Sequence, residues 1–159
     1  MANWRMQLHP DAAPEAMRHA VESLAAGYIG LDFAEDVGDL SRVTREQLTQ
    51  QKPYLQFADD MKVGDRVLIM VHHFPFALVT VDSEYNYIRN VAPELGVWFR
   101  HFRKVKDLRY YADHNTNARE WVRIPMTDTI CPLRRDDTAS NQLIEEWLQA
   151  TSEQPATVG

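Results

Sequence analysis

Residues 62–88, KVGDRVLIMVHHFPFALVTVDSEYNYI, contain two long apolar runs separated by a short turn. The first run, residues 66–73, is almost continuously apolar, which is typical of a strand buried on both faces of a sheet. Pro75 is tolerable where the chain turns, and residues 77–88 return as the partner strand. The segment therefore predicts a hairpin whose first strand is central in the sheet and buried.

The remaining elements are predicted from periodicity and from turn residues. Pro14 suits a first helical position, and residues 14–26 place apolar side chains on one face at helical spacing, at Met17, Ala20, Val21 and Leu24. Gly27 ends this helix, and residues 27–33 read as a short strand. Later segments predict helices from Thr44, over 54–61 and over 140–151, and strands over 96–105, 120–126 and 128–133.

Strands thus dominate the middle of the chain, with helices between them and at the end. This order is typical of an α+β fold, and we expect a bent mixed sheet or partial barrel flanked by helices. The 159 residues fit one domain, assigned to residues 1–150. Residues 151–159, TSEQPATVG, read as a disordered tail or as a linker to a further module.

Composition restricts the location and the class of partner. The net charge is −6, which argues against a wholly non-specific nucleic-acid binder but not against one local basic surface. The sequence has no apolar run of about 18 residues, so we expect no membrane partner. The N-terminus lacks an apolar signal region, and Cys131 is the single cysteine, so we expect a cytoplasmic protein.

No pattern in the sequence predicts catalysis. There is no nucleophile elbow, phosphate-binding loop or dinucleotide glycine motif. His72 and His73 are adjacent in a strand, so their side chains point to opposite faces and cannot easily chelate one metal ion. The acidic loop after residue 31 could attract a hard cation through Asp32, Glu35, Asp36 and Asp39, but a nuclease metal site fits it poorly. We therefore expect no enzyme activity, no metal and no cofactor.

A basic segment stands out in this acidic chain. Residues 100–109, RHFRKVKDLR, carry five cations against the single acid Asp107. Basic side chains contact phosphates and give nucleic-acid affinity its salt dependence. The residues assigned to a nucleic-acid backbone are Arg89, Arg100, Arg103, Lys104 and Lys106. The alternative is a solvated strand face balanced by nearby carboxylates.

Aromatic residues occur where the predicted strands begin or end. A flipped base needs stacking faces and a polar group that reads its edge. The residues assigned to such a base pocket are Asp32, Phe33, Tyr85, Tyr87 and Trp98. The alternatives are that these rings fill the core and that Asp32 caps the loop backbone.

Four segments, in order, resemble the strand and turn motifs of EVE-type domains, a branch of the PUA-like group that also contains the YTH readers of methylated adenine. They are GYIGLDFAEDVGDLS (27–41), FADDMKVGDRVLIMV (57–71), ALVTVDSEYNYI (77–88) and HFRKVKDL (101–108). In addition, WRMQLHPD (4–11), followed by a helix, resembles the N-terminal modules of McrBC-type modification-dependent restriction proteins.

This resemblance implies a PUA-like fold with a pocket that reads a modified base in DNA. It also implies a nuclease subunit or effector domain as partner. The chain departs from the motifs by Asp32 where Gly is usual, by Phe33 where Trp is usual, by one extra residue in the acidic loop, and by Asp107 where a later Trp is common. Two alternatives stay open, an RNA-binding PUA-like domain and a small ASCH-type nucleoside hydrolase that would use Lys62, Glu84 and Tyr85.

Overall fold

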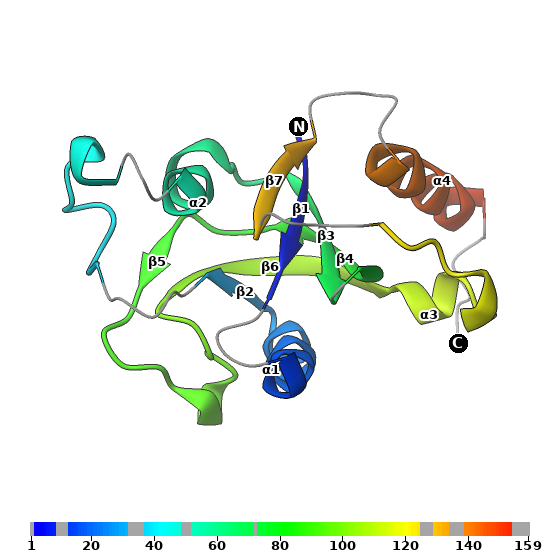
Figure 1. Ribbon diagram of the computed structural model, residues 1–159, viewed down its shortest axis with the longest axis horizontal. Helices are drawn as coiled ribbons and strands as arrows, with labels where there is room; N and C mark the ends of the chain where they lie inside the picture. Colours follow the sequence, from blue (N-terminus) through cyan, green and yellow to red (C-terminus); the bar gives the residue numbers. More distant parts are fainter. Residues whose placement is uncertain are drawn as a thin grey trace.

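The strands of the protein form one strongly curled mixed sheet, a half-barrel, surrounded by helices (Figure 1). The computed structural model describes residues 2–8, 13–31, 37–48, 52–71, 73–124, 129–133 and 139–153. Within these residues seven strands pair in the order β2-β6-β4-β3-β1-β7, and β5 pairs with β6. The expectation of an α+β fold with a bent mixed sheet is confirmed at this level.

The described residues form seven strands, four α-helices and four further helical turns. The strands are β1 (Asn3–Gln7), β2 (Tyr28–Leu31), β3 (Arg66–Val71), β4 (Phe74–Val81), β5 (Asn86–Tyr87), β6 (His101–Tyr110) and β7 (Ile130–Leu133). The α-helices are α1 (Ala13–Ala26), α2 (Lys52–Leu55), α3 (Tyr111–His114) and α4 (Ala139–Glu153). A π-helical turn (η2, Gln56–Asp60) continues α2, and 3-10 turns are η1 (Arg45–Leu48), η3 (Pro93–Leu95) and η4 (Ala118–Glu120).

Strand β3 is central, as the apolar run predicted. It pairs in parallel with β1 and antiparallel with β4. Val67 and Ile69 pack into the main core with α1 and α2, whereas Leu68 and Met70 pack into a second core against α4. Because both faces are covered, every side chain in the middle of β3 must be apolar, and the run shows no alternation. His72 lies outside the described residues.

A bulge in β6 bends the sheet. Asp107 adopts a left-handed conformation with φ 54°. Lys106 pairs with Thr80 and Arg109 with Leu78, so two residues of β6 face one residue of β4. Such a bulge sharpens the local twist of the strand. The bend lets the first half of β6 pair with β2 and β5 while its second half pairs with β4.

Some predicted boundaries differ from the structure. Strand β6 begins at His101, because residues 92–97 form a tight turn around the left-handed Gly96. Residues 120–124 are not a strand, because they end a 3-10 turn and then run without strand pairing. Strand β1 and helix α3 are additional elements. Helix α3 is too short to give a periodic signal, whereas residues 3–7 alternate polar and apolar side chains as a half-buried strand does.

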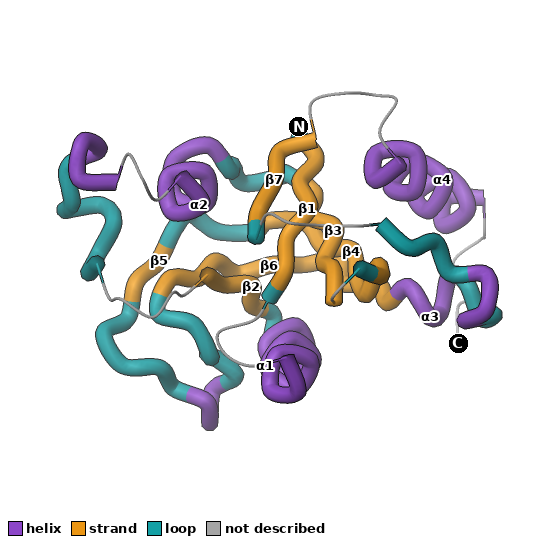
Figure 2. Tube along the Cα trace, viewed as in Figure 1, coloured by secondary structure: helices purple, strands orange, loops and turns teal. Residues whose placement is uncertain are grey.

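The C-terminal helix extends beyond the predicted end of the domain. Helix α4 ends at Glu153, three residues beyond the boundary at residue 150, and residues 154–159 lie outside the described part of the chain. Figure 2 shows the strands gathered in the middle of the molecule with the helices placed around them. None of the described helices is long and apolar enough to cross a membrane.

Candidate nucleic-acid interface

Four aromatic side chains gather around His101 at the first residue of β6. We call this group the histidine cluster, and its members are Tyr54, Phe57, Tyr85, Tyr87 and His101. Leu31 at the end of β2 pairs with His101 on one edge of β6, and Tyr87 of β5 pairs with it on the other. The cluster therefore forms where two short strands meet the start of β6.

The rings of the cluster are in direct contact. Tyr54 lies 4.8 Å from His101 between ring centroids, Tyr87 lies 5.2 Å away, and Tyr85 stacks at 5.9 Å with an angle of 22°. The Phe57 ring meets the Tyr85 ring edge to face. Tyr54, Phe57 and His101 are buried, whereas Tyr85 and Tyr87 are half-buried. The outer wall of the cluster is thus formed by Tyr85 and Tyr87.

A hydrogen-bond chain connects the cluster to the loop before η1. The backbone N–H of Leu40 donates to the Tyr85 hydroxyl oxygen at 3.1 Å, and that hydroxyl lies 2.6 Å from His101 Nδ1. Burial raises the pKa of Tyr85 well above its ordinary value, so the phenol is neutral at neutral pH. The Ser41 hydroxyl and backbone N–H donate to Asp39 and lower the pKa of its carboxyl.

The structure brings together only part of the predicted base pocket. Tyr85 and Tyr87 both belong to the histidine cluster. Trp98 lies half-buried against the main core. Asp32 and Phe33 lie outside the described residues, directly after Leu31, the residue that pairs with His101.

Arg103 does not have the role predicted for it. It is 0% exposed, so it cannot contact a phosphate on the surface. Its guanidinium donates Nε and Nη2 to the carbonyl oxygen of Phe57 at 3.0 and 2.8 Å. Nη2 also donates to the carbonyls of Ala58 and Met61, and Nη1 donates to that of Ser83. The assignment of Arg103 to the nucleic-acid backbone is therefore wrong.

The physical reason lies in the π-helical turn after α2. The carbonyls at the end of a helical segment have no partner within it. The planar guanidinium carries several donors in a fixed fork and can bind several carbonyls at once. Arg103 also lies over the Phe57 ring, 5.6 Å from its centroid. Burial lowers its pKa, while the carboxylates of Glu84, Asp65 and Asp59 act in the opposite direction. Arg103 thus fixes the segment that carries Phe57 of the cluster.

The other predicted basic residues lie nearer the surface. Lys104, Lys106 and Arg89 are exposed, and Arg100 is half-buried. Lys106 Nζ lies 3.6 Å from a carboxylate oxygen of Asp82, so part of its charge is balanced. Lys104 and Lys106 stand on β6, and Arg89 and Arg100 stand on the loop between β5 and β6.

Sequence reasoning missed three members of the cluster: Tyr54, Phe57 and His101. A signal for them was present. Helical spacing placed Tyr54 and Phe57 on one face of the segment 54–61, and alternation placed His101 with the inward residues Phe99 and Arg103. All three are buried as those patterns require. Their meeting depends on the packing of α2 against β6, which the local patterns do not contain.

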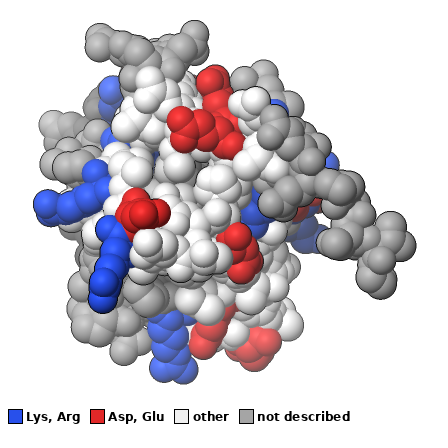
Figure 3. Space-filling model, turned by 90° about the vertical axis from the view of Figure 1, so that its right-hand side faces the viewer, with Lys and Arg blue, Asp and Glu red and all other residues white. Residues whose placement is uncertain are grey.

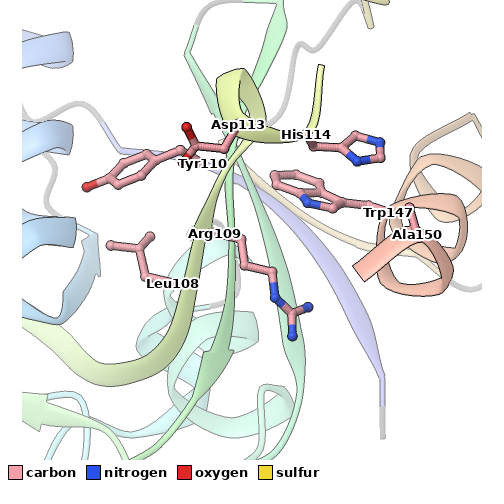
Figure 4. A pocket seen from close by; sticks show the side chains of 7 residues that line it. All are labelled: Leu108, Arg109, Tyr110, Asp113, His114, Trp147 and Ala150. Carbon is pink, nitrogen blue, oxygen red and sulfur yellow. The ribbon is translucent and has the colours of Figure 1, made fainter. Parts of the chain in front are cut away.

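A cavity lies at the far end of β6, between α3 and α4 (Figure 4). It has a volume of about 350 Å³, and its lining includes Arg109, Asp113, His114 and Trp147. The His114 and Trp147 rings stack at 5.3 Å with an angle of 19°. Acidic and basic side chains are interspersed over this end of the molecule (Figure 3). The mixed charge makes it a weaker candidate for a nucleic-acid surface than the histidine cluster.

Neither similarity to known proteins nor a metal-binding group in the described part of the chain assigns a function to this site. The sequence matches no known family model, and no curated protein matches it. Among the residues that the structure describes, no group of three or more His, Cys, Asp or Glu side chains is arranged to hold a metal ion. The candidate function therefore depends on the geometry of the histidine cluster and its surroundings.

Proposed function

We propose that this chain is a non-catalytic reader of a modified base in DNA, which binds the flipped base against the histidine cluster. The observation that carries the proposal is the position of Tyr85 and Tyr87. They form a half-buried aromatic wall over a buried histidine, beside the end of β2. A flipped base requires stacking faces, which the two half-buried tyrosine rings supply.

The sequence adds a second wall to this arrangement. Asp32 and Phe33 directly follow Leu31 in the sequence, and Leu31 pairs with His101. A carboxylate can accept a hydrogen bond from the exocyclic amine of cytosine. The proposal thus keeps these two residues as the polar reader and the opposite stacking face.

The exposed cations supply the backbone contacts in this proposal. Lys104, Arg89 and Arg100 remain as phosphate ligands, with Lys106 partly balanced by Asp82. Since basic contacts release counterions, we expect affinity to fall as salt rises, with a log–log slope of about −3 for three to four phosphate contacts. A role as the recognition module of a cytoplasmic modification-dependent restriction system, with a separate nuclease as partner, follows from the resemblance to EVE-type domains.

The test is binding to short oligonucleotides that carry cytosine, methylcytosine, hydroxymethylcytosine or methyladenine, as DNA duplexes and as RNA. Tyr87→Ala should weaken binding to the preferred modified duplex by about 1–3 kcal/mol, the value of one stacking face. It should change binding to the unmodified duplex much less. Tyr110→Ala is the matched control, because Tyr110 is also half-buried and lies at the other end of β6.

Three results would contradict the proposal. Equal affinity for modified and unmodified duplexes would remove the reader function. Preference for RNA would favour the RNA-binding alternative. Nucleoside hydrolysis abolished by Tyr85→Phe would favour the hydrolase, although the Tyr85 hydroxyl is already engaged by Leu40 and His101.

A further inference from the structure

The loop that leaves the histidine cluster and returns to it forms a projecting finger. We define the finger as residues 88–100, and it joins β5 to β6. Figure 2 shows it as two loop segments on either side of one short helical turn, extending away from the strands. Tyr87 and His101, which pair with each other, are the residues at its two ends. Two members of the cluster therefore hold the base of the finger.

Hydrogen bonds and packing hold the finger in one conformation. Ile88 N–H donates to the Arg100 carbonyl at 2.9 Å, and Ala92 and Val97 exchange two backbone hydrogen bonds. Between them η3 ends at the left-handed Gly96. A Cβ on Gly96 would lie 2.1 Å from the Ala26 Cβ, so the turn rests directly on the end of α1. This support on α1 keeps the tip at a defined distance from the cluster.

The tip presents an apolar side chain to solvent. Leu95 is 67% exposed, the largest exposure among the described large apolar side chains. Val91 in the same finger is 41% exposed. Leu95 is therefore available to a partner, and covering it would gain the free energy of burying an apolar side chain. Arg89 is exposed in the same finger, so the apolar tip and a cation stand close together along the chain.

We propose that Leu95 is a wedge that enters the base stack of duplex DNA and occupies the space left by the base that turns toward the histidine cluster. This inference rests on the proposed function. Proteins that distort a duplex commonly insert an apolar side chain such as leucine between base steps, while basic residues hold the adjacent phosphates. The finger joins a wedge, a cation and the base-binding wall in one segment of chain.

The occupant follows from the placement of these groups. A single strand leaves no gap in a stack, so the wedge applies to a duplex with an extruded base. An apolar protein partner would gain from Leu95 and Val91 but would leave the Arg89 charge unused. Glu94 also lies exposed in the turn. The carboxylate of Glu94 repels the phosphates of every duplex. Glu94→Gln should therefore raise the affinity for modified and unmodified duplexes by similar factors.

The test compares the full chain with Leu95→Ala on three probes: the preferred modified duplex, the unmodified duplex and the modified single strand. Leu95→Ala should lower the affinity for the modified duplex on the order of tenfold, because no side chain then fills the gap that the extruded base leaves in the stack. Single-strand affinity should stay within about twofold, because stacking on the cluster is intact. 2-Aminopurine opposite the target should fluoresce less with the variant.

Two control variants keep the test decisive. Val63 is 50% exposed in the turn before β3, so Val63→Ala removes an exposed apolar side chain outside the finger and should change no affinity. Leu95→Met retains a wedge and should retain most of the affinity. Thermal melting of each variant identifies any loss that comes from unfolding.

Each outcome decides between the two proposals. Unchanged duplex affinity for Leu95→Ala, with wild-type discrimination intact, would overturn the wedge and leave the reader function standing. An equal loss on duplex and single strand would also overturn it, because Leu95 would then be a general contact. If the wild-type chain does not distinguish any modified duplex, or binds RNA or a protein instead, the reader function fails and the wedge fails with it.

Discussion

The Tyr85 hydroxyl lies 2.6 Å from Nδ1 of His101 and accepts the backbone N–H of Leu40. One phenol oxygen thus joins the first residue of β6 to the loop before η1, and its ring stacks on the same histidine. The candidate base site is built around this pair, so its energetics can be tested apart from any ligand.

Tyr85→Phe should lower the free energy of unfolding by about 1–2 kcal/mol at pH 7, because two hydrogen-bonded groups lose their partner. The pKa of Tyr85 is raised in the folded protein. Its stabilisation is therefore complete below the unfolded tyrosine pKa of about 10 and is lost as pH rises above it. Denaturant unfolding should show the gap between wild type and variant closing at alkaline pH. A gap that is constant up to pH 11 would contradict the burial of this phenol.

Arg103→Met should lower the free energy of unfolding by roughly 3 kcal/mol, because it leaves the buried carbonyls of Phe57 and Met61 without donors. Lys104→Met is the matched control, since Lys104 is exposed one residue away, and it should change stability by no more than about 0.5 kcal/mol. Chemical denaturation measures both. Equal effects of the two variants would show that Arg103 does not fix the π-helical turn.

Gly30→Ala should destabilise by about 1–3 kcal/mol through overpacking. A Cβ there would lie 2.3 Å from the Cβ and 2.4 Å from the Cγ of Phe99. Gly38 separates crowding from backbone strain, because it has φ 77° and open space around it. Gly38→Ala should cost only about 1 kcal/mol, from the left-handed conformation alone. Thermal melting that ranks Gly38→Ala as the more harmful change would contradict the close packing of β2 on Phe99.

Asp107→Gly should leave stability unchanged or raise it slightly, whereas Asp107→Val should lower it by about 1–2 kcal/mol. The reason is that the bulge holds Asp107 at φ 54°, where glycine is unstrained and a β-branched residue is not. Urea unfolding of both variants checks the order. Should valine be tolerated as well as glycine, the bend in β6 would have to arise elsewhere.

Local patterns in the sequence were sufficient for the elements with a clear period. The apolar run 66–73 gave the central strand, since only a strand covered on both faces needs apolar residues throughout. The stripe in residues 14–26 gave α1. Phe99, His101 and Arg103 alternate with more exposed residues and are buried, although the sequence analysis had assigned Arg103 to the surface. Each of these elements depends on which side chains avoid water. The order of apolar and polar residues in the segment itself shows this.

Tertiary structure alone decided what the buried polar residues contact. The charge of Arg103 predicted a phosphate ligand, but carbonyls 42 to 46 residues away along the chain bind its guanidinium instead. The meeting of Tyr54 with His101 and the bend at Asp107 likewise arise between distant segments. The chemistry of a side chain determines which groups it can bind. Long-range packing determines which of those groups it contacts. For this reason the sequence determined the apolar central strand and the helix before it, and only the fold assigned the burial and the partners of polar residues such as Arg103.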